Sequence, residues 1–219
     1  MHRLLFEKTG NAVWISHLDL MRLFQRAFKR SGLPLTHTKG YNPRPSVSIA
    51  LPLSVGVESL CELLDFELEG MDVPCDEIRT RLNQTLVEGV RVLQVYESEK
   101  KINELAFLKC DIQMEYDHGV PEEGAAQIAA LFNTEEVIVP KKSKNGIIDQ
   151  NIIPMIQSFA VEQIDETTLS VHVYICCQNP SLNPTQVVAA IERYLPEFKP
   201  DFSRCSRLEI FDRNHNIFR

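Results

Sequence analysis

Apolar positions along the chain follow two spacings, every second residue in some segments and every third or fourth residue in others. The two-residue spacing predicts strands at 3–8, 12–15, 33–38, 46–51, 62–69 and 90–96, and again at 105–116, 136–140, 159–164, 169–177 and 207–212. The helical spacing predicts helices at 17–31, 75–87, 121–132 and 184–194, whereas residues 141–156 show neither spacing. Strands and helices therefore alternate along both halves of the chain.

The order of these elements predicts the fold class. Each half contains the order β-α-β-β-α-β, with extra extended pieces, and this order is typical of the ferredoxin-like split βαβ fold. We expect an α+β protein made of two ferredoxin-like (βαββαβ) units side by side: residues 1–99, a polar linker at 100–104, and residues 105–219. The halves share no close sequence repeat, so the duplication rests on the order of elements.

Composition places the chain among globular proteins. Of its 219 residues, 44% are hydrophobic and 24% are charged, which is ordinary usage for a folded domain. No apolar run approaches the roughly 20 residues of a membrane-spanning helix. The first residues include Glu7, where a secretory signal peptide would remain apolar. We therefore expect a cytoplasmic protein with no membrane segment.

The six cysteines do not follow a metal-binding pattern. No two of them form a C-x-x-C pair, and none has histidines at zinc-finger spacing. The vicinal pair Cys176-Cys177 falls within an apolar strand, where cysteine usually behaves as a small buried hydrophobic residue. The sequence therefore predicts no metal and no cofactor.

Charge is unevenly distributed along the chain. The net charge is −7, yet residues 1–50 carry eight basic side chains and two acidic ones, and residues 51–219 carry 15 basic and 28 acidic ones. The basic residues of the first segment are Arg3, Lys8, Arg22, Arg26, Lys29, Arg30, Lys39 and Arg44. Two interpretations are open: the segment binds a polyanion, or it faces acids of the same chain such as Glu62, Asp65, Glu67 and Glu69.

The helix expected at 17–31 has a basic face. Ser16 and Asp19 match a capping box, which satisfies the free amides at the start of a helix. Like charges spaced four residues apart repel each other, so phosphates or acids from elsewhere are expected to neutralise this face. The residues of the face, at helical spacing, are Arg22, Arg26, Lys29 and Arg30.

The loop at 39–45 (KGYNPRP) is the most unusual stretch of the sequence. Gly40 can adopt a positive φ, Asn42-Pro43 favours a turn, and the prolines stiffen the exit from the loop. Such a loop would display Lys39, Tyr41 and Arg44, and cations beside an aromatic ring suit single-stranded nucleic acid. The alternative is a well-formed turn in which Tyr41 packs into the core and Arg44 pairs with an acid.

Two histidines flank this basic region. His17 and His37, with Lys39 and Tyr41, are candidates for a metal-independent acid–base site, because histidine can move protons at neutral pH. Ser16, His17, Asp19 and His37 also have a purely structural interpretation, since capping positions and strand surfaces often hold idle histidines. Nucleophile-elbow, P-loop, dinucleotide-binding and zinc-protease motifs are absent. We therefore assign no catalytic residue.

Three motifs in the first 70 residues resemble one bacterial family. They are residues 14–22 (WISHLDLMR), 39–45 (KGYNPRP) and 50–59 (ALPLSVGVES), and together they are similar to the radical SAM-linked proteins, a family of unknown function. Its members occur fused to radical SAM proteins or as separate chains beside them. Asn183-Pro184 stands where the family usually has Arg-Pro. Because the three-cysteine cluster motif is absent here, the resemblance implies a bacterial partner of a radical SAM enzyme.

The expected architecture is also similar to that of CRISPR repeat-processing endoribonucleases, which pair two ferredoxin-like units. Fold alone does not define function. Our first hypothesis is a non-catalytic module that binds RNA, such as transfer or ribosomal RNA, for a radical SAM enzyme. Two alternatives stay open: a protein adaptor for that enzyme without RNA contact, and a metal-independent endoribonuclease. The RNA-binding residues predicted are Arg22, Arg26, Arg30, Lys39, Gly40, Tyr41, Asn42 and Arg44.

Overall fold

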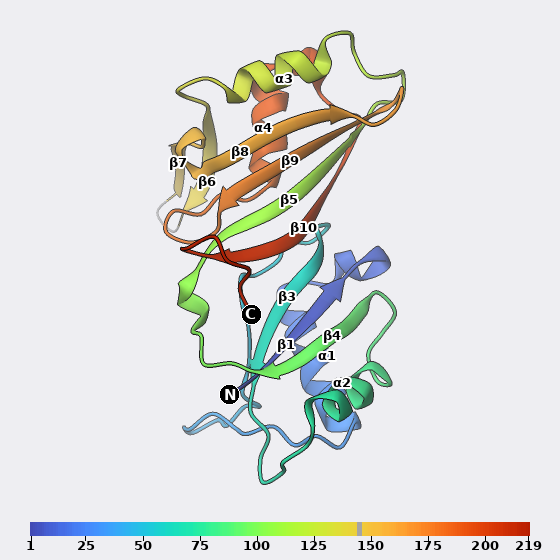
Figure 1. Cartoon of the computed structure of the whole chain (residues 1–219), viewed down its shortest axis with the longest axis vertical. Helices are drawn as coiled ribbons and strands as arrows, with labels where there is room; N and C mark the ends of the chain where they lie inside the picture. Colours follow the sequence, from blue (N-terminus) through green and yellow to red (C-terminus); the bar gives the residue numbers. More distant parts are fainter. Residues whose placement is uncertain (144–145) are drawn as a thin grey trace. The chain divides into compact units, whose positions relative to one another are not determined.

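Contacts between residues divide the chain into two units. The computed structural model describes residues 1–143 and 146–219. The first unit contains Met1–Ile102 together with Arg219, and the second contains Asn103–Phe218. Both units combine strands with helices (Figure 1), so the predicted α+β class is confirmed. Among the described residues, no helix is both long and apolar enough to cross a membrane.

In the first unit, two helices accompany an antiparallel sheet. Strand β1 lies between β4 and β3, and β2 pairs with the other edge of β3. The elements in chain order are β1 (His2–Lys8), a short 3-10 helix (Gly10–Trp14), α1 (His17–Arg30), β2 (Val47–Ile49), β3 (Glu58–Phe66), α2 (Cys75–Asn83) and β4 (Val90–Glu97).

One face of α1 fixes the helix on this sheet. Its buried residues recur at helical spacing, and they are Leu20, Phe24, Ala27 and Phe28. The Phe24 ring lies 4.7 Å from the Phe6 ring, and the Phe28 ring lies 4.8 Å from the Phe66 ring. Each fully buried aromatic side chain stabilises the fold by roughly 1.5–3 kcal/mol. Because this face is buried, the opposite, basic face of α1 is exposed to solvent.

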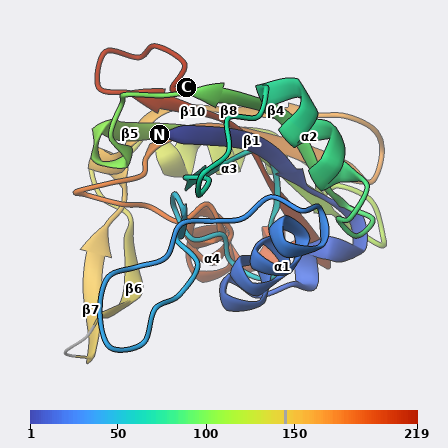
Figure 2. The same cartoon turned by 90° about the horizontal axis from the view of Figure 1, so that it is seen from below.

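The second unit has a four-stranded antiparallel sheet in the order β10-β5-β9-β8. Helices α3 and α4 lie on one side of this sheet (Figure 2). The elements in chain order are β5 (Leu105–Glu115), α3 (Gly124–Phe132), β6 (Ile138–Ser143), β7 (Gly146–Asn151), β8 (Ile156–Gln163), β9 (Thr168–Cys176), α4 (Thr185–Tyr194) and β10 (Phe202–Asp212).

Two expected strands of the first unit do not form. Residues 12–15 lie within and just after the 3-10 helix Gly10–Trp14, because Gly10 has a φ of +54° and starts a tight turn. Residues 33–38 make only isolated bridges, Leu35 to Leu68 and His37 to Pro45. Pro34 has no N–H to donate, and prolines also interrupt the facing segment, so no continuous ladder develops.

Two further boundaries differ from the prediction. Strands β6 and β7 pair as a hairpin within the stretch that showed no regular spacing, so that expectation was wrong. The helix predicted at 75–87 ends at Asn83. The Asn83 side chain turns to β4, where it accepts from the Val92 amide and donates to the Val92 carbonyl, each at 2.8 Å. Helix α2 therefore ends at the residue whose side chain bonds β4.

Candidate nucleic-acid interface

At the start of α1, Ser16 caps the helix as predicted, but Asp19 bonds the Ser16 hydroxyl and not the Ser16 amide that a full capping box uses. Ser16 Oγ accepts a hydrogen bond from the Asp19 amide at 3.2 Å and donates one to Asp19 Oδ2 at 2.8 Å. The bond from the Ser16 hydroxyl, and after it the bond from Arg22, holds the pKa of the Asp19 carboxyl below its usual value. A satisfied and negatively charged first turn does not attract an anion. Any phosphate site in this region therefore lies on the side of α1 and not at its N-terminus.

The basic face of α1 is only partly neutralised by the chain itself. Arg22 pairs with Asp19 Oδ1 at 3.0 Å, and Arg30 donates to the Thr85 carbonyl at 2.6 Å. Arg26 and Lys29 are exposed, and no carboxylate among the described residues lies within 4.0 Å of either. Two cations of this face thus remain available to an external anion.

The loop after α1 is closed at its neck by backbone bonds. The Thr38 amide donates to the Arg44 carbonyl at 2.8 Å, and the Arg44 amide donates to Thr38 Oγ1 at 3.0 Å. Gly40 has a φ of +142°, a conformation that other residues rarely adopt. The predicted positive φ is therefore confirmed, and the five residues between the neck positions form the tip of a defined turn.

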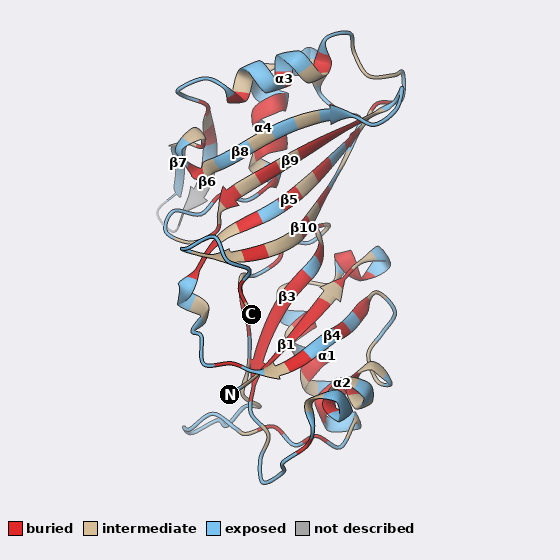
Figure 3. Ribbon diagram, in the orientation of Figure 1, coloured by how far each residue is buried: buried red, intermediate tan, exposed pale blue. Residues whose placement is uncertain are grey.

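The tip of this loop is fully exposed to solvent (Figure 3). Tyr41 has 99% of its surface accessible, so the alternative that packs it into the core is wrong. Lys39 and Arg44 are also exposed, and neither has a carboxylate within 4.0 Å among the described residues. We call Lys39, Gly40, Tyr41, Asn42 and Arg44 the cationic loop.

Two basic residues of the same segment are structural. Arg3 is fully buried, and its Nε and Nη2 donate to the two carboxylate oxygens of Asp65 at 2.6 and 3.0 Å. Lys8 is buried as well and donates to the Val13 carbonyl at 3.1 Å. Arg3 and Asp65 face each other in the register of β1 and β3. Pairing with the chain's own acids is thus the correct interpretation for Arg3.

The two histidines have separate surroundings. His17 Nδ1 is buried without a hydrogen-bond partner in the described structure, and His37 Nδ1 lies 3.9 Å from Glu69 Oε2. Among the described residues, no hydrogen bond or ion pair joins His17 to His37 or either of them to Tyr41. The residues predicted for acid–base chemistry are therefore not hydrogen-bonded to one another in the described structure, and their role stays a prediction.

The cysteines carry free thiols, and most are buried. Burial raises the pKa of Cys110 and Cys177 to about 12 and that of Cys205 to about 11. A thiol with such a pKa is protonated at neutral pH and is a poor nucleophile or metal ligand. In the described part of the chain, no group of three or more histidine, cysteine, aspartate or glutamate residues is placed to hold a metal ion.

Sequence reasoning missed three exposed apolar side chains in the first unit. Trp14 and Leu18 are 68% and 67% exposed, and Val55, which precedes Gly56 in the sequence, is 52% exposed. The Gly56 amide donates to the Val13 carbonyl at 2.9 Å, and a side chain at Gly56 would lie 3.4 Å from the Trp14 ring. Two of the three family motifs therefore meet at the Trp14 ring. The signal in the sequence was the single tryptophan, two residues before the helix cap Ser16.

A family model matches residues 2–184 of the chain, and its description is "Uncharacterized protein conserved in bacteria (DUF2344)". The chain belongs to this family. A search of curated protein sequences found no match. The association with radical SAM enzymes, expected from the sequence motifs, stays a prediction.

Solved structures resemble the chain in fold. One is a chain in the crystal structure of a Cbf5-Nop10-Gar1 complex, with a TM-score of 0.51 and 10% identity over 95% of this chain and 48% of that one. Another is a chain in a structure of an H/ACA RNP bound to a substrate RNA, with a TM-score of 0.48, 10% identity, and coverage of 94% and 46%. The chain spans about half the length of these structural relatives.

Proposed function

We propose that this protein is a non-catalytic RNA-binding module that works in the bacterial cytoplasm beside a radical SAM enzyme. The RNA contact consists of the cationic loop and the basic face of α1. The radical SAM partner comes from the family resemblance of the sequence motifs. We also propose that each unit is a ferredoxin-like fold, because the element order and the strand orders β4-β1-β3-β2 and β10-β5-β9-β8 agree with that fold.

One observation supports the RNA contact above all others. Tyr41 is completely exposed at the tip of a defined turn, between two cations that have no carboxylate within 4.0 Å in the described structure. Nothing in the fold of this unit requires an aromatic ring at that position. Proteins that bind single-stranded RNA place aromatic rings where bases can stack and cations where the backbone phosphates run. The loop offers this combination in a preformed shape.

The exposed cations of α1 extend the same chemistry. Arginine donates two parallel hydrogen bonds to a phosphate, and its charge does not depend on pH in the physiological range. Arg26 has no paired acid within 4.0 Å among described residues, so binding a phosphate there does not require an internal ion pair to break. Arg22 and Arg30 have internal partners at the surface, which screening by water makes weak.

The test is the affinity of the full chain for a fluorescently labelled single-stranded RNA, measured by anisotropy. We expect Tyr41→Ala to weaken binding by about 5- to 150-fold, the loss of one stacked base, and Tyr41→Phe to keep most of the affinity because the ring remains. Arg44→Ala is expected to weaken binding as well. The matched control is Arg79→Ala, which replaces a partly exposed arginine on α2 that pairs with Asp76 at 3.3 Å.

The control separates specific loss from a general charge effect. Arg44→Ala and Arg79→Ala remove the same charge from the same unit, so only a difference between them supports a phosphate contact at the loop. Equal affinities of the wild type, Tyr41→Ala and Arg44→Ala, or no RNA binding at all, would contradict the proposed function.

A protein adaptor is the second candidate, and the exposed Trp14 ring, which adjoins Gly56 next to the exposed Val55, favours it. Clustered apolar side chains on a surface often mark a protein contact. The test is coexpression with a radical SAM enzyme of the same bacterium and purification of the tagged chain after nuclease treatment. Recovery of the enzyme by the wild type, and its loss with Leu18→Ser, would support this candidate. Leu18 is exposed, so the substitution should leave the fold intact.

A further inference from the structure

The sheet of the second unit has one face without helices. Along β5, Leu108, Cys110 and Ile112 are buried on the side of α3 and α4, and Phe107 and Lys109 alternate with them on the opposite side. Gly124 of α3 approaches Leu169 of β9, which confirms which side the helices cover. The uncovered face of β9 likewise presents its alternate residues, and they are Ser170, His172, Tyr174 and Cys176.

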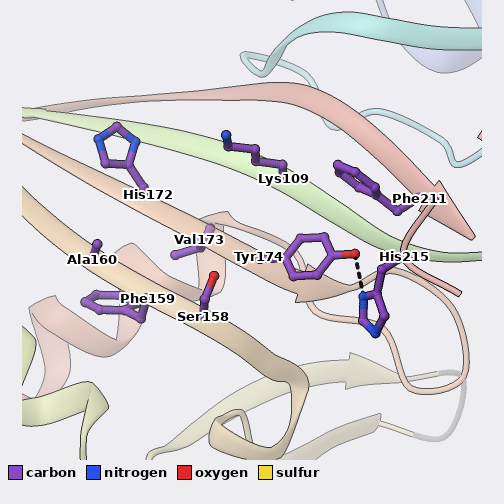
Figure 4. A pocket seen from close by; sticks show the side chains of 9 residues that line it. All are labelled: Lys109, Ser158, Phe159, Ala160, His172, Val173, Tyr174, Phe211 and His215. Atoms are coloured by element: carbon purple, nitrogen blue, oxygen red, sulfur yellow. Dashed lines mark hydrogen bonds between the residues drawn. The ribbon is translucent and has the colours of Figure 1, made fainter. Parts of the chain in front are cut away.

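Aromatic rings gather at one end of this uncovered face. Tyr174 lies 5.3 Å from Phe107 and 5.2 Å from Phe211 between ring centroids, so rings of β5, β9 and β10 adjoin one another. The His215 ring stacks on Phe107 at 4.6 Å with an angle of 10°, and its Nδ1 lies 3.0 Å from the Tyr174 hydroxyl. The Tyr174 ring is thereby fixed in position, as Figure 4 shows.

A hollow of about 390 Å³ lies beside these rings. Ser158 and Ala160 of β8 have small side chains and border it, and His172 and Tyr174 of β9 stand next to them (Figure 4). Alternate residues of a strand are about 7 Å apart, which leaves room for one flat ring in van der Waals contact with both neighbours. The volume falls within the range of about 300–1,000 Å³ that small-molecule sites occupy.

The polar groups around the hollow are also held in place. His172 Nδ1 lies 2.9 Å from Asp111 Oδ1, and its Nε2 lies 3.8 Å from a Glu162 oxygen. Lys109 faces Tyr174 in the register of β5 and β9, is exposed, and has no carboxylate within 4.0 Å in the described part of the chain. The site thus combines fixed aromatic rings with one available cation.

We propose that this hollow is a second RNA-contact site, which takes a splayed-out base of a single-stranded RNA between His172 and Tyr174 and its phosphate on Lys109. This inference rests on the proposed function, because it adds a second RNA contact, on the second unit, to the contact proposed at the cationic loop. RNA-binding sheets of four strands use rings on the open face to stack two or three bases. The carboxylates of Asp111 and Glu162 would repel a polyphosphate, whereas an uncharged base can bind beside them.

The test uses the full chain and a labelled single-stranded RNA oligomer. We expect Tyr174→Leu to weaken binding by about 5- to 150-fold, the loss of one stacked base, and Lys109→Glu to weaken it further in the double variant. The matched control is Lys199→Glu, an exposed lysine of the same unit that lies 3.6 Å from Glu192 and does not border the hollow. Since Lys109 is exposed, Lys109→Glu keeps the test valid if Tyr174→Leu fails to fold.

Ultraviolet crosslinking followed by peptide mapping distinguishes the two sites. Two results together would support the inference. RNA crosslinks would fall within β5 or β9, and Lys109→Glu would bind the RNA more weakly than Lys199→Glu does. Crosslinks confined to the cationic loop, with wild-type affinity in Lys109→Glu and Tyr174→Leu, would overturn it and leave the proposed function standing. A titration with free nucleosides is the third arm. Saturable nucleoside binding that Tyr174→Leu abolishes, without any RNA binding, would overturn the proposed function and with it the RNA contact at the hollow.

Discussion

The basic side chains of the first fifty residues fall into two groups with opposite environments. Arg3 and Lys8 lie on the central strand β1, where both are buried and bonded within the chain. Lys39 and Arg44 lie on a loop, where both are exposed and have no carboxylate within 4.0 Å among the described residues. Net charge alone would treat these four residues alike. Their places in the fold decide which are structural and which can bind an external anion.

The difference has an energetic cause. A buried charge loses its hydration and must be compensated by an opposite charge and hydrogen bonds, which Asp65 and the Lys100 carbonyl provide to Arg3. A cation on an exposed loop keeps its hydration and needs no partner. It can therefore exchange water for phosphate at little cost.

The largest effect is expected for the buried pair. Asp65→Ala leaves Arg3 buried without its carboxylate, and should lower the free energy of unfolding by about 3–5 kcal/mol. Arg44→Ala should change it by no more than about 0.5 kcal/mol, because the side chain is exposed. Urea denaturation of both variants measures the contrast. Similar stabilities for the two would contradict the division between structural and available cations.

A double variant sharpens the same result. Replacing both members of a buried pair by apolar residues of similar size is often nearly neutral, because no unpaired charge remains. The variant Arg3→Met with Asp65→Leu should therefore lose much less stability than Asp65→Ala alone. A double variant that is as unstable as the single one would show that the pair itself, and not the unpaired charge, determines stability.

The second effect concerns pH. Burial raises the pKa of Tyr96 to about 12, although the nearby Arg3 acts in the opposite direction. An unfolded tyrosine ionises near its usual pKa of about 10, so the stability contributed by the neutral form is complete below that pH. It is lost as the pH rises from about 10 to about 12. We expect Tyr96→Phe to lose less stability than the wild type over this interval, measured as the urea midpoint at each pH.

The buried tyrosine of the second unit is the reference for this measurement. Burial also raises the pKa of Tyr116 to about 12, so Tyr116→Phe should likewise flatten the alkaline loss of stability. If neither variant differs from the wild type between pH 10 and 12, burial does not raise the pKa of these hydroxyls and this part of the account fails.

The smallest effect concerns α1. Arg26 stands four residues from both Arg22 and Arg30, and each such like-charge pair costs about 0.2–0.5 kcal/mol. Arg26→Gln should therefore raise the free energy of unfolding by about 0.4–1 kcal/mol while it weakens RNA binding. Opposite signs for stability and affinity would mark Arg26 as a binding residue. A loss of both would instead indicate that Arg26 supports the fold.

Much of the fold followed from local patterns. Helix α1, its Ser16 cap and its buried stripe were predictable because the signals lie within one or two turns of each other. Two predictions were wrong, a strand at 33–38 and an irregular stretch at 141–156. Pairing in these segments depends on a distant or weakly patterned partner. Boundaries such as the end of α2 depended on one side chain that bonds another element.

The candidate sites were predictable to a smaller extent. The composition of the cationic loop indicated its chemistry, but exposure of Tyr41 is a property of the whole unit and only the structure provides it. The partner of Arg3 lies 62 residues away in sequence, so no local pattern identifies it. In the second unit, Phe107, Tyr174 and Phe211 come together through strand pairing, which the alternation of residues does not specify.

The salt dependence of RNA affinity tests the central claim most directly. For a single strand, each phosphate contact adds about 0.7 to the slope of log affinity against log salt concentration. We predict that Arg44→Ala lowers the steepness of this slope by about one contact, while Arg79→Ala leaves it as in the wild type. Equal slopes for all three proteins, or an affinity that does not change with salt, would contradict a phosphate contact at the cationic loop.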